Sequence, residues 1–393
     1  MTILTNVAIW DGTSEDIVPG LDALEITDGA ITRVGSSDEL HGGDSRDMAG
    51  LYVMPGMIDA HVHLCLDPEI SNPEDQDKFS DAELLSRMAG RANAMVKAGI
   101  TTARDLGGGN WLELTIRDQI NEGMLTGPRL LCSGQPVTSI MGHCHFWGGE
   151  AADTAAAMEV IERQLGHGVD LIKVMATGGN LTKGSQPADA QFDEATLSAI
   201  VAKANGTGRR VAAHCHGTGG IGNAARAGVT TIEHCSWVGD AGWARNFDAG
   251  VCRDIVEQGA WVSPTINLGW KRRIGNASYE TLIQGNFQRM REAGVKLIAS
   301  TDAGIPNVFH HHLPLALPVF AHFAGLSNVE VLRAATSECA EAIGLGGSVG
   351  RIASGFSADL AFFEGNPLAN LDALATPATV MARGHFVQTG GAG

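Results

Sequence analysis

The sequence predicts an α/β fold, in which a (β/α)8 or TIM barrel is joined to a small β-sandwich domain built from both chain ends. Three observations predict it. Between residues 53 and 349, short apolar runs alternate with amphipathic helical stretches, a pattern typical of parallel strands joined by helices. The runs number eight, as in a (β/α)8 barrel. Residues 1–52 and 350–393 show strand patterns without a long helical period, so we expect them to form one composite domain.

The N-terminal segment is predicted to contain short strands and turns. Leu24–Gly35 holds two alternating strands around Asp28-Gly29, which is a hairpin signature. The C-terminal segments Gly350–Phe363 and Thr379–Val387 are rich in strand-forming residues as well. We therefore expect the two ends of the chain to meet in one small β-domain beside the barrel.

The barrel strands are predicted from continuous apolar runs. The candidates are the run before His61, Thr101–Leu106, Arg129–Gly134, Asp170–Ala176, Arg210–His216, Thr230–Ser236, Trp261–Ile266 and Lys296–Asp302. The main helical stretches are Asp81–Ala98, Asp153–His167, Asp193–Thr207, Ser278–Ala293 and, after the last strand, Asn328–Leu345. Several of them open on Asp or Ser, as helix N-caps do. An open, doubly wound sheet is the alternative, because strand count alone does not establish closure.

Composition narrows the class of protein. The chain has 393 residues, 44% of them hydrophobic, which is enough for a large core. Its net charge is −17 and no basic cluster occurs, so nucleic acid is not an expected partner. No apolar run approaches the ~20 residues that span a bilayer, and the start lacks a signal-peptide pattern. The seven scattered cysteines suggest reduced thiols. We expect a cytoplasmic homo-oligomer with a small-molecule substrate and no membrane partner.

An apolar run leads into His61 and His63 at the end of the first predicted strand. Side chains two apart on a strand share one face, so both imidazoles project to the same side. That arrangement supplies half of a metal site. Taken alone, two such histidines are also compatible with ordinary buried or surface positions.

Further polar residues stand at the ends of other predicted strands, where barrel active sites are built. They are Lys173 in the fourth strand, His214 and His216 at the end of the fifth, His234 at the end of the sixth and Asp302 at the end of the eighth. Singly, Lys173 could extend to the barrel rim and Asp302 could cap a helix. Together with the first His-x-His pair, they predict a site for two divalent cations, with Zn²⁺ as the expected metal.

The lysine has a specific explanation in such a site. A buried ammonium is costly unless it is paired. Carbamylation of Lys173 by CO2 would turn this cation into an anion able to bridge two metal ions. Two ions would lower the pKa of a shared water and polarise a scissile carbonyl. The metal-bridged hydroxide would be the nucleophile, and Asp302 would pass a proton to the leaving nitrogen.

At these residues the sequence resembles the amidohydrolase superfamily of metal-dependent hydrolases. The stretches Ile172–Gly179, His214–Gly217 and Ile232–His234 resemble its imidazolonepropionase-related, Xaa-Pro dipeptidase-like branch, which includes ochratoxin-amide hydrolases. The resemblance covers nearly the whole chain. Imidazolonepropionase itself lacks the bridging lysine and uses one metal, so Lys173 argues against that activity here.

The resemblance also implies a role for each residue. One ion, the more buried, would be held by His61, His63 and Asp302, the other by His214 and His234, with carboxylated Lys173 as the bridge. His216 would face the substrate carbonyl or the tetrahedral oxyanion. His143, in a loop after the third strand, would contact the substrate, unless it only packs the loop. After the seventh strand, one of Lys271, Arg272 and Arg273 could pair with a substrate carboxylate, unless solvent surrounds them.

The expected activity is hydrolysis of an amide C–N bond in a small N-acyl amino acid or dipeptide-like substrate. The same site would also serve a hydrolase of carbamates, ureas or other xenobiotic amides. A non-catalytic binding protein on a degenerate barrel is the alternative of another class. Loss of metal ligands would favour that alternative, and the sequence retains all of them.

Overall fold

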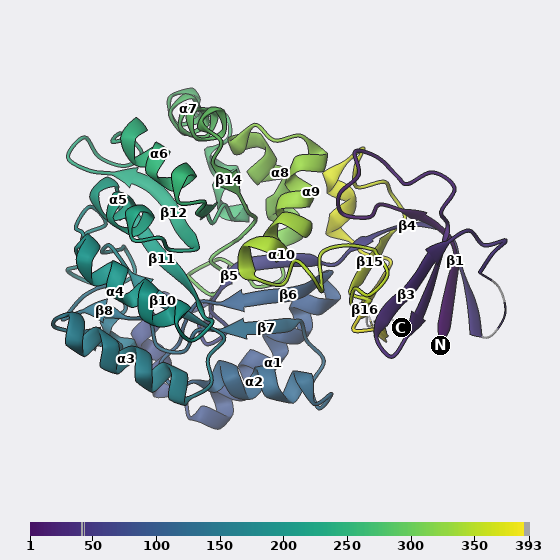
Figure 1. Ribbon diagram of the computed structural model, residues 1–393, viewed down its shortest axis with the longest axis horizontal. Coiled ribbons are helices and arrows are strands. Elements are labelled where there is room, and N and C mark those ends of the chain that lie inside the picture. Colours follow the sequence, from purple (N-terminus) through teal and green to yellow (C-terminus); the bar gives the residue numbers. More distant parts are fainter. Residues whose placement is uncertain (41, 43, 389–393) are drawn as a thin grey trace.

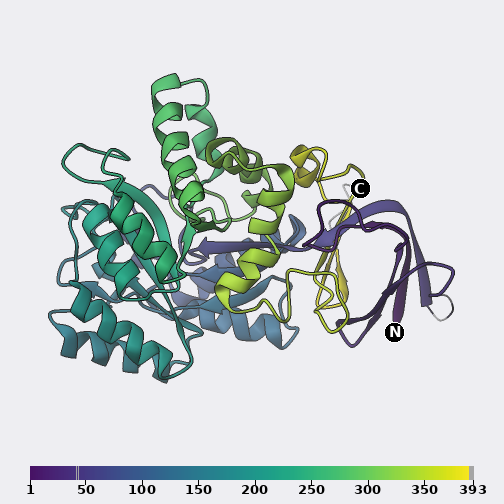
Figure 2. The same ribbon diagram turned by 45° about the horizontal axis from the view of Figure 1, so that its top comes forward.

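The computed structural model describes residues 1–40, 42 and 44–388 of the chain. Parallel strands surrounded by helices occupy one end of the molecule, and a mixed sheet occupies the other (Figure 1). The first and last strands of the chain both belong to the mixed sheet, and a turned view shows this sheet curling at the same end (Figure 2). The fold is therefore α/β, as predicted.

All eight strands predicted for the barrel are present in chain order. They form two parallel sheets, one of three strands and one of five. The first contains β5 (Met57–Val62), β6 (Ile100–Asp105) and β7 (Arg129–Cys132). The second contains β10 (Leu171–Met175), β11 (Arg210–Gly217), β12 (Thr231–Val238), β13 (Trp261–Ser263) and β14 (Lys296–Leu297). Their side chains are almost all buried, which explains the continuous apolar runs.

Backbone hydrogen bonds connect the two sheets on both sides. On one side, the amide of Val137 donates to the carbonyl of Lys173 at 2.9 Å, and that of Met175 donates to Val137 at 2.8 Å. On the other side, the amide of Asp302 donates to the carbonyl of His61 at 2.9 Å, and that of His63 donates to Ala303 at 2.7 Å. The sheets themselves remain separate, so closure into one eight-stranded barrel stays a prediction.

The helices that follow the strands are α1 (Asp81–Lys97), α2 (Leu112–Asn121), α3 (Thr154–Gly166), α4 (Glu194–Asn205), α5 (Thr218–Arg226), α6 (Ala249–Glu257), α7 (Ala277–Ala293) and α8 (Leu313–Ala324). Asp153 and Asp193 cap α3 and α4 through their carboxylates, as predicted. The cap of α7 is Asn276, two residues before the Ser278 that the sequence suggested.

The predicted helix Asn328–Leu345 is instead two helices, α9 (Asn328–Ala334) and α10 (Ser337–Ile343). The carbonyls of Ala334 and Ala335 accept hydrogen bonds from Ala299 and Ile58, both at 2.8 Å. Because the barrel strands use these carbonyls, they are not available to a continuing helix. The break thus ties this helical segment to β5 and to the chain that follows β14.

Both chain ends contribute to one seven-stranded sheet with the order β17-β16-β15-β4-β1-β2-β3. Its strands are β1 (Thr2–Ile9), β2 (Ala23–Thr27), β3 (Ala30–Gly35), β4 (Asp44–Pro55), β15 (Leu360–Phe363), β16 (Thr379–Ala382) and β17 (His385–Val387). The predicted hairpin is present between β2 and β3, with left-handed backbone at Asp28 and Gly29. The two chain ends meet where β4 pairs with β15. A two-layered sandwich, and the domain limits at 52 and 350, stay predictions.

Short elements complete the described part of the chain. They are β8 (Thr138–Ser139), β9 (Glu150–Ala151) and the 3-10 helices η1 (Pro73–Lys78), η2 (His145–Trp147), η3 (Leu268–Arg273) and η4 (Leu371–Ala375). All seven cysteines are free thiols, as predicted. Among the described residues no single helix is long and apolar enough to cross a bilayer. Taken together, α8 and the α9–α10 segment have the length and apolar composition of a membrane span, but they are bent by 120° relative to each other.

Candidate metal centre

The structure brings the predicted strand-end residues together around one cavity of about 380 Å³. Its lining includes His61, His63, Lys173, His214, His216, His234 and Asp302. They lie on β5, β10, β11 and β12, directly after β5, and in the chain that follows β14. Parallel α/β folds place their active sites at the C-terminal ends of their strands, where His61, His63, His214, His216 and Asp302 are found.

The first group of candidate ligands is His61, His63 and Asp302. The two Nε2 atoms lie 3.3 Å apart, and Oδ1 of Asp302 lies 3.3 Å from one and 3.4 Å from the other. Nδ1 of His61 is 3.0 Å from the Glu233 carboxylate, and Nδ1 of His63 is 2.9 Å from the carbonyl of Gly107. Carboxylates and carbonyls only accept, so each Nδ1 carries the hydrogen. Two Nε2 lone pairs and a carboxylate oxygen therefore converge, an arrangement that a cation stabilises.

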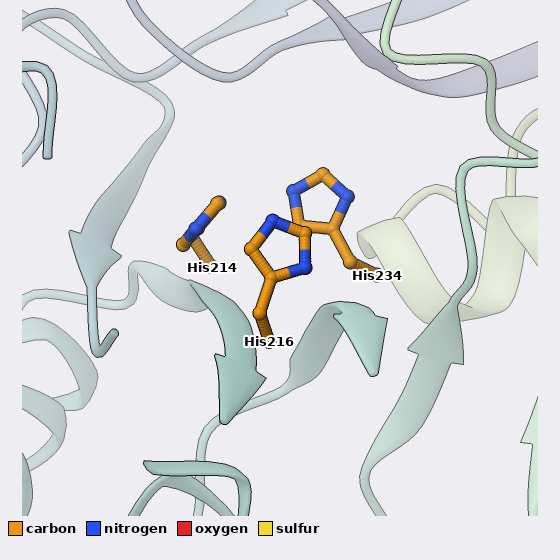
Figure 3. A group of neighbouring side chains, drawn as sticks. All are labelled: His214, His216 and His234. Carbon is orange, nitrogen blue, oxygen red and sulfur yellow. The ribbon is translucent and has the colours of Figure 1, made fainter. Parts of the chain in front are cut away.

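The second group is His214, His216 and His234, whose candidate ligand atoms lie within 4.8 Å of one another. Figure 3 shows the three rings gathered together, those of His214 and His216 from β11 and that of His234 from β12. Nε2 of His214 lies 3.0 Å from the carbonyl of Gly178, so Nδ1 of this ring holds the lone pair. The other two rings use Nδ1 to contact hydroxyls, Ser236 at 2.9 Å and Thr265 at 2.8 Å. Their Nε2 atoms are thus free to face the cavity.

His216 lies closer to this group than the sequence interpretation required. Its ring centroid is 4.5 Å from that of His234, and the centroid of His214 is 4.6 Å from the same ring. The geometry therefore adds His216 to the candidate ligands. The substrate-facing role that the sequence assigned to it stays a prediction.

Lys173 lies within this histidine cluster and is only 1% exposed. Its amine is buried, and no described residue offers it a hydrogen-bond partner. Burial lowers the pKa of Lys173, although Glu233 and Asp302 act in the opposite direction. An unpaired buried ammonium is unfavourable, so this side chain fits a site that converts it to another form.

The charge state of the cluster suits divalent cations. Burial, with a contribution from Lys173, lowers the pKa of His61 to about 4 and that of His216 to about 4. Burial and the neighbouring imidazoles hold the pKa of His214 and His234 well below the ordinary value. Neutral imidazole is the form that binds metal. The pKa of Asp302 lies below its ordinary value although burial acts to raise it, so this carboxylate is ionised.

A buried pair behind the first group was missed by the sequence interpretation. Nη2 of Arg104 donates to Glu233 at 2.8 Å, and its Nε donates to the carbonyl of Ala60 at 2.7 Å. Glu233, 0% exposed, accepts from Thr231 and holds Nδ1–H of His61. A carboxylate behind a metal-binding imidazole fixes its tautomer and orientation. The available signal was a charged residue inside an apolar strand, as for Lys173.

The predicted substrate contact, His143, also lines the cavity. Its ring centroid is 4.5 Å from that of His214, and its Nδ1 is buried without a described hydrogen-bond partner. Burial is the main cause that lowers the pKa of His143 to about 3, so the ring is neutral. The structure places this residue at the site, and its role in binding substrate stays a prediction.

The cavity opens between aromatic and basic side chains. Trp243, Trp270 and Tyr279 line it, together with Arg272 and Arg273. The ring of Trp243 lies 4.9 Å from that of His216 and is 38% exposed. Lys271, which the sequence grouped with the two arginines, does not line the cavity.

Comparison with known proteins agrees with this geometry. The sequence profile of the Amidohydrolase family matches residues 52–387. Ochratoxinase from Aspergillus niger is 26% identical, over 91% of this chain and 80% of its own length. Imidazolonepropionase from Mesorhizobium japonicum is 24% identical, over 90% of each chain. The crystal structure of a Xaa-Pro dipeptidase with bound methionine in the active site superposes with a TM-score of 0.84 and 25% identity, over 98% of this chain and 99% of that one.

Proposed function

The chain belongs to the amidohydrolase family, and we propose that it is a binuclear metal-dependent hydrolase that cleaves the amide bond of a small N-acyl amino acid or dipeptide-like substrate. That it is a hydrolase of this family follows from the match over residues 52–387 and from its named hydrolase relatives. The substrate class, the metal and the roles of individual residues are our proposal.

One observation carries the proposal: two adjacent groups of imidazole and carboxylate donors border one cavity with a buried, unpaired lysine amine. His61, His63 and Asp302 would hold one ion, and His214 and His234 would hold the other. Lys173, once carbamylated, would lie between them as a shared anionic ligand. Zn²⁺ suits this set of nitrogen and oxygen donors.

When bound, the ions would acidify a water molecule and polarise the scissile carbonyl. Asp302 would accept the proton of that water and deliver it to the leaving nitrogen. His216 would stabilise the negative charge that develops on the carbonyl oxygen, and His143 would contact the substrate from the loop after β7. Glu233, through Nδ1 of His61, would keep that ring in the tautomer that leaves Nε2 unprotonated.

The relatives support an amide substrate that contains an amino acid. One relative is named a Xaa-Pro dipeptidase and holds methionine in its active site. Trp243 and Trp270 line the cavity here and offer apolar surface to such a side chain. Imidazolonepropionase activity is less well supported. That enzyme is expected to have no bridging lysine, whereas this chain has Lys173 at the corresponding position.

The finer features of the fold belong to the same proposal. The hydrogen bonds that connect the two parallel sheets support closure into one (β/α)8 barrel. The seven-stranded sheet would be one layer of the small composite domain. The free thiols support a cytoplasmic location, and a homo-oligomeric assembly remains the expectation.

A substrate screen tests the proposal. Purified protein would be supplied with Zn²⁺, Mn²⁺ or Co²⁺ and bicarbonate, and then offered a library of N-acyl amino acids and dipeptides. Turnover of at least one member is expected. A parallel panel of carbamates and ureas distinguishes the alternative: activity there, with none on the first library, would contradict the proposed substrate class.

A further inference from the structure

Two arginines stand at the cavity mouth without acidic partners. Arg272 and Arg273 line the cavity, and neither guanidinium forms an ion pair with a carboxylate whose side chain the structure describes. The guanidinium of Arg273 lies over the ring of Tyr279 at 4.5 Å from its centroid. This stacking restricts the side chain while it leaves the planar donor edge open.

The turn that carries these arginines is attached to the chain beside Asp302. The side chain of Asn267 caps η3 by accepting from the amide of Gly269 at 3.0 Å. The same side chain donates from Nδ2 to the carbonyl of Thr301 at 3.2 Å. The strands that precede the two segments, β13 and β14, are paired in parallel. The arginines are thus tied to the side of the cavity on which Asp302 lies.

The cavity has an excess of basic side chains. Among the described residues that line it, Asp302 is the one carboxylate, whereas Arg272 and Arg273 are basic; Lys173 is not counted, because the proposed function turns it into an anion. This contrasts with the whole chain, whose net charge is −17. A positive mouth on an acidic protein concentrates anions at that point.

We propose that Arg272 and Arg273 bind the α-carboxylate of the amino acid that leaves, so that the substrate must end in a free carboxylate. This inference rests on the proposed function. In that reaction water adds across the C–N bond: the hydroxyl stays on the acyl carbon, and the proton goes from Asp302 to the nitrogen. The carboxyl carbon is two covalent bonds from that nitrogen, so it lies on the Asp302 side, next to the arginines. A guanidinium binds a carboxylate through two parallel hydrogen bonds.

Binding of a product and its neutral analogue tests the inference without any need for turnover. Calorimetry would compare L-methionine with L-methioninamide on the metal-loaded native protein, on the double variant Arg272→Gln/Arg273→Gln and on the control Lys271→Gln. We expect the native protein and the control to bind methionine at least 10-fold more tightly than the amide. The double variant should lose this preference. Equal binding of both compounds by the native protein, or a preference that survives in the double variant, would overturn the inference.

Kinetics separate this inference from the proposed function. For a substrate identified in the library, the double variant should lower kcat/KM for the free acid at least 10-fold, mainly through KM, and leave the matching C-terminal amide unaffected. Equal losses on acid and amide would again overturn the carboxylate role. Absence of turnover by the native enzyme would contradict the proposed function, and the calorimetric preference would still decide the role of the arginines.

Discussion

At the scale of single residues, the site depends on side chains whose hydrogen bonds determine where their lone pairs point. Acceptors behind His61 and His63 place the hydrogen on Nδ1 and leave Nε2 toward Asp302. A carbonyl behind His214 has the opposite effect and leaves Nδ1 free. These orientations are built into the protein, so the donors are preorganised before any ion arrives.

Replacing Lys173 with Ala should remove the shared anionic ligand. We expect the variant to bind less than the full complement of ions, and short carboxylates added to the buffer should restore part of the binding. Metal analysis after gel filtration measures this directly. Full occupancy of Lys173→Ala without any added carboxylate would show that the lysine does not bridge the ions.

Replacing Asp302 with Asn should keep the fold and remove the proton carrier. Turnover is expected to fall by about 10²–10⁴-fold, the usual contribution of general acid–base catalysis, while circular dichroism stays unchanged. Metal content must be measured alongside, because Asp302 is also a candidate ligand. Near-normal turnover by this variant would mean that another group moves the proton.

Replacing Glu233 with Gln should weaken metal binding although no candidate metal ligand is replaced. The change removes the charge that pairs with Arg104 and the fixed acceptor for Nδ1–H of His61. Loss of such an outer carboxylate typically costs about 10–100-fold in metal affinity. Titration with Zn²⁺ in a competing chelator would measure it, with exposed Glu364→Gln as the control. Unchanged affinity would reduce Glu233 to a structural role.

At the scale of elements, the strand ends carry backbone that departs from regular geometry. His234, Thr265 and Asp302 all have left-handed backbone, with φ of 66°, 53° and 61°. Such conformations cost about 1–3 kcal/mol each for residues other than glycine. They cluster at the cavity and aim side chains inward. The strand β14 ends at Leu297, five residues before the predicted limit at Asp302.

The loop that carries His143 ends at Gly149, which lies close to Pro136 in the segment before β8. A methyl group there would lie 1.8 Å from the carbonyl oxygen of Pro136. Gly149→Ala should therefore displace the loop, destabilise the protein by about 1–3 kcal/mol and raise KM, while both ions stay bound. Gly166→Ala is the matched control, because a methyl group at this last residue of α3 would have no neighbouring atom within 4 Å. If Gly149→Ala left KM unaltered, the loop would have no part in substrate binding.

At the scale of the whole molecule, the sequence predicted most of the architecture. Continuous apolar runs marked the eight parallel strands, because strands buried on both faces need no polar side chains. The break between α9 and α10 was not predictable, since it depends on Ala334 and Ala335 accepting hydrogen bonds from distant strands. The ion pair of Arg104 with Glu233 was missed for a similar reason: its partners lie 129 positions apart in the chain.

The candidate site was predictable where residue types alone specify chemistry. Histidines, a lysine and an aspartate at strand ends indicated metal, and the structure gathers them at one cavity. Position on a strand did not indicate which ring of the His214–His216 pair faces an ion, because that depends on acceptors such as Gly178 and Ser236. Substrate selectivity depends on loops whose placement the sequence pattern did not specify.

The central claim is that these separated side chains hold a pair of cations. The most direct measurement is the metal content of protein purified without chelators, determined by mass spectrometry and expressed per chain. Two divalent ions per chain are expected, with Zn²⁺ the main species, together with loss of both in the presence of a strong chelator. A protein that emerges without bound metal, and takes up none from added Zn²⁺ and bicarbonate, would contradict the claim and favour a non-catalytic binding protein.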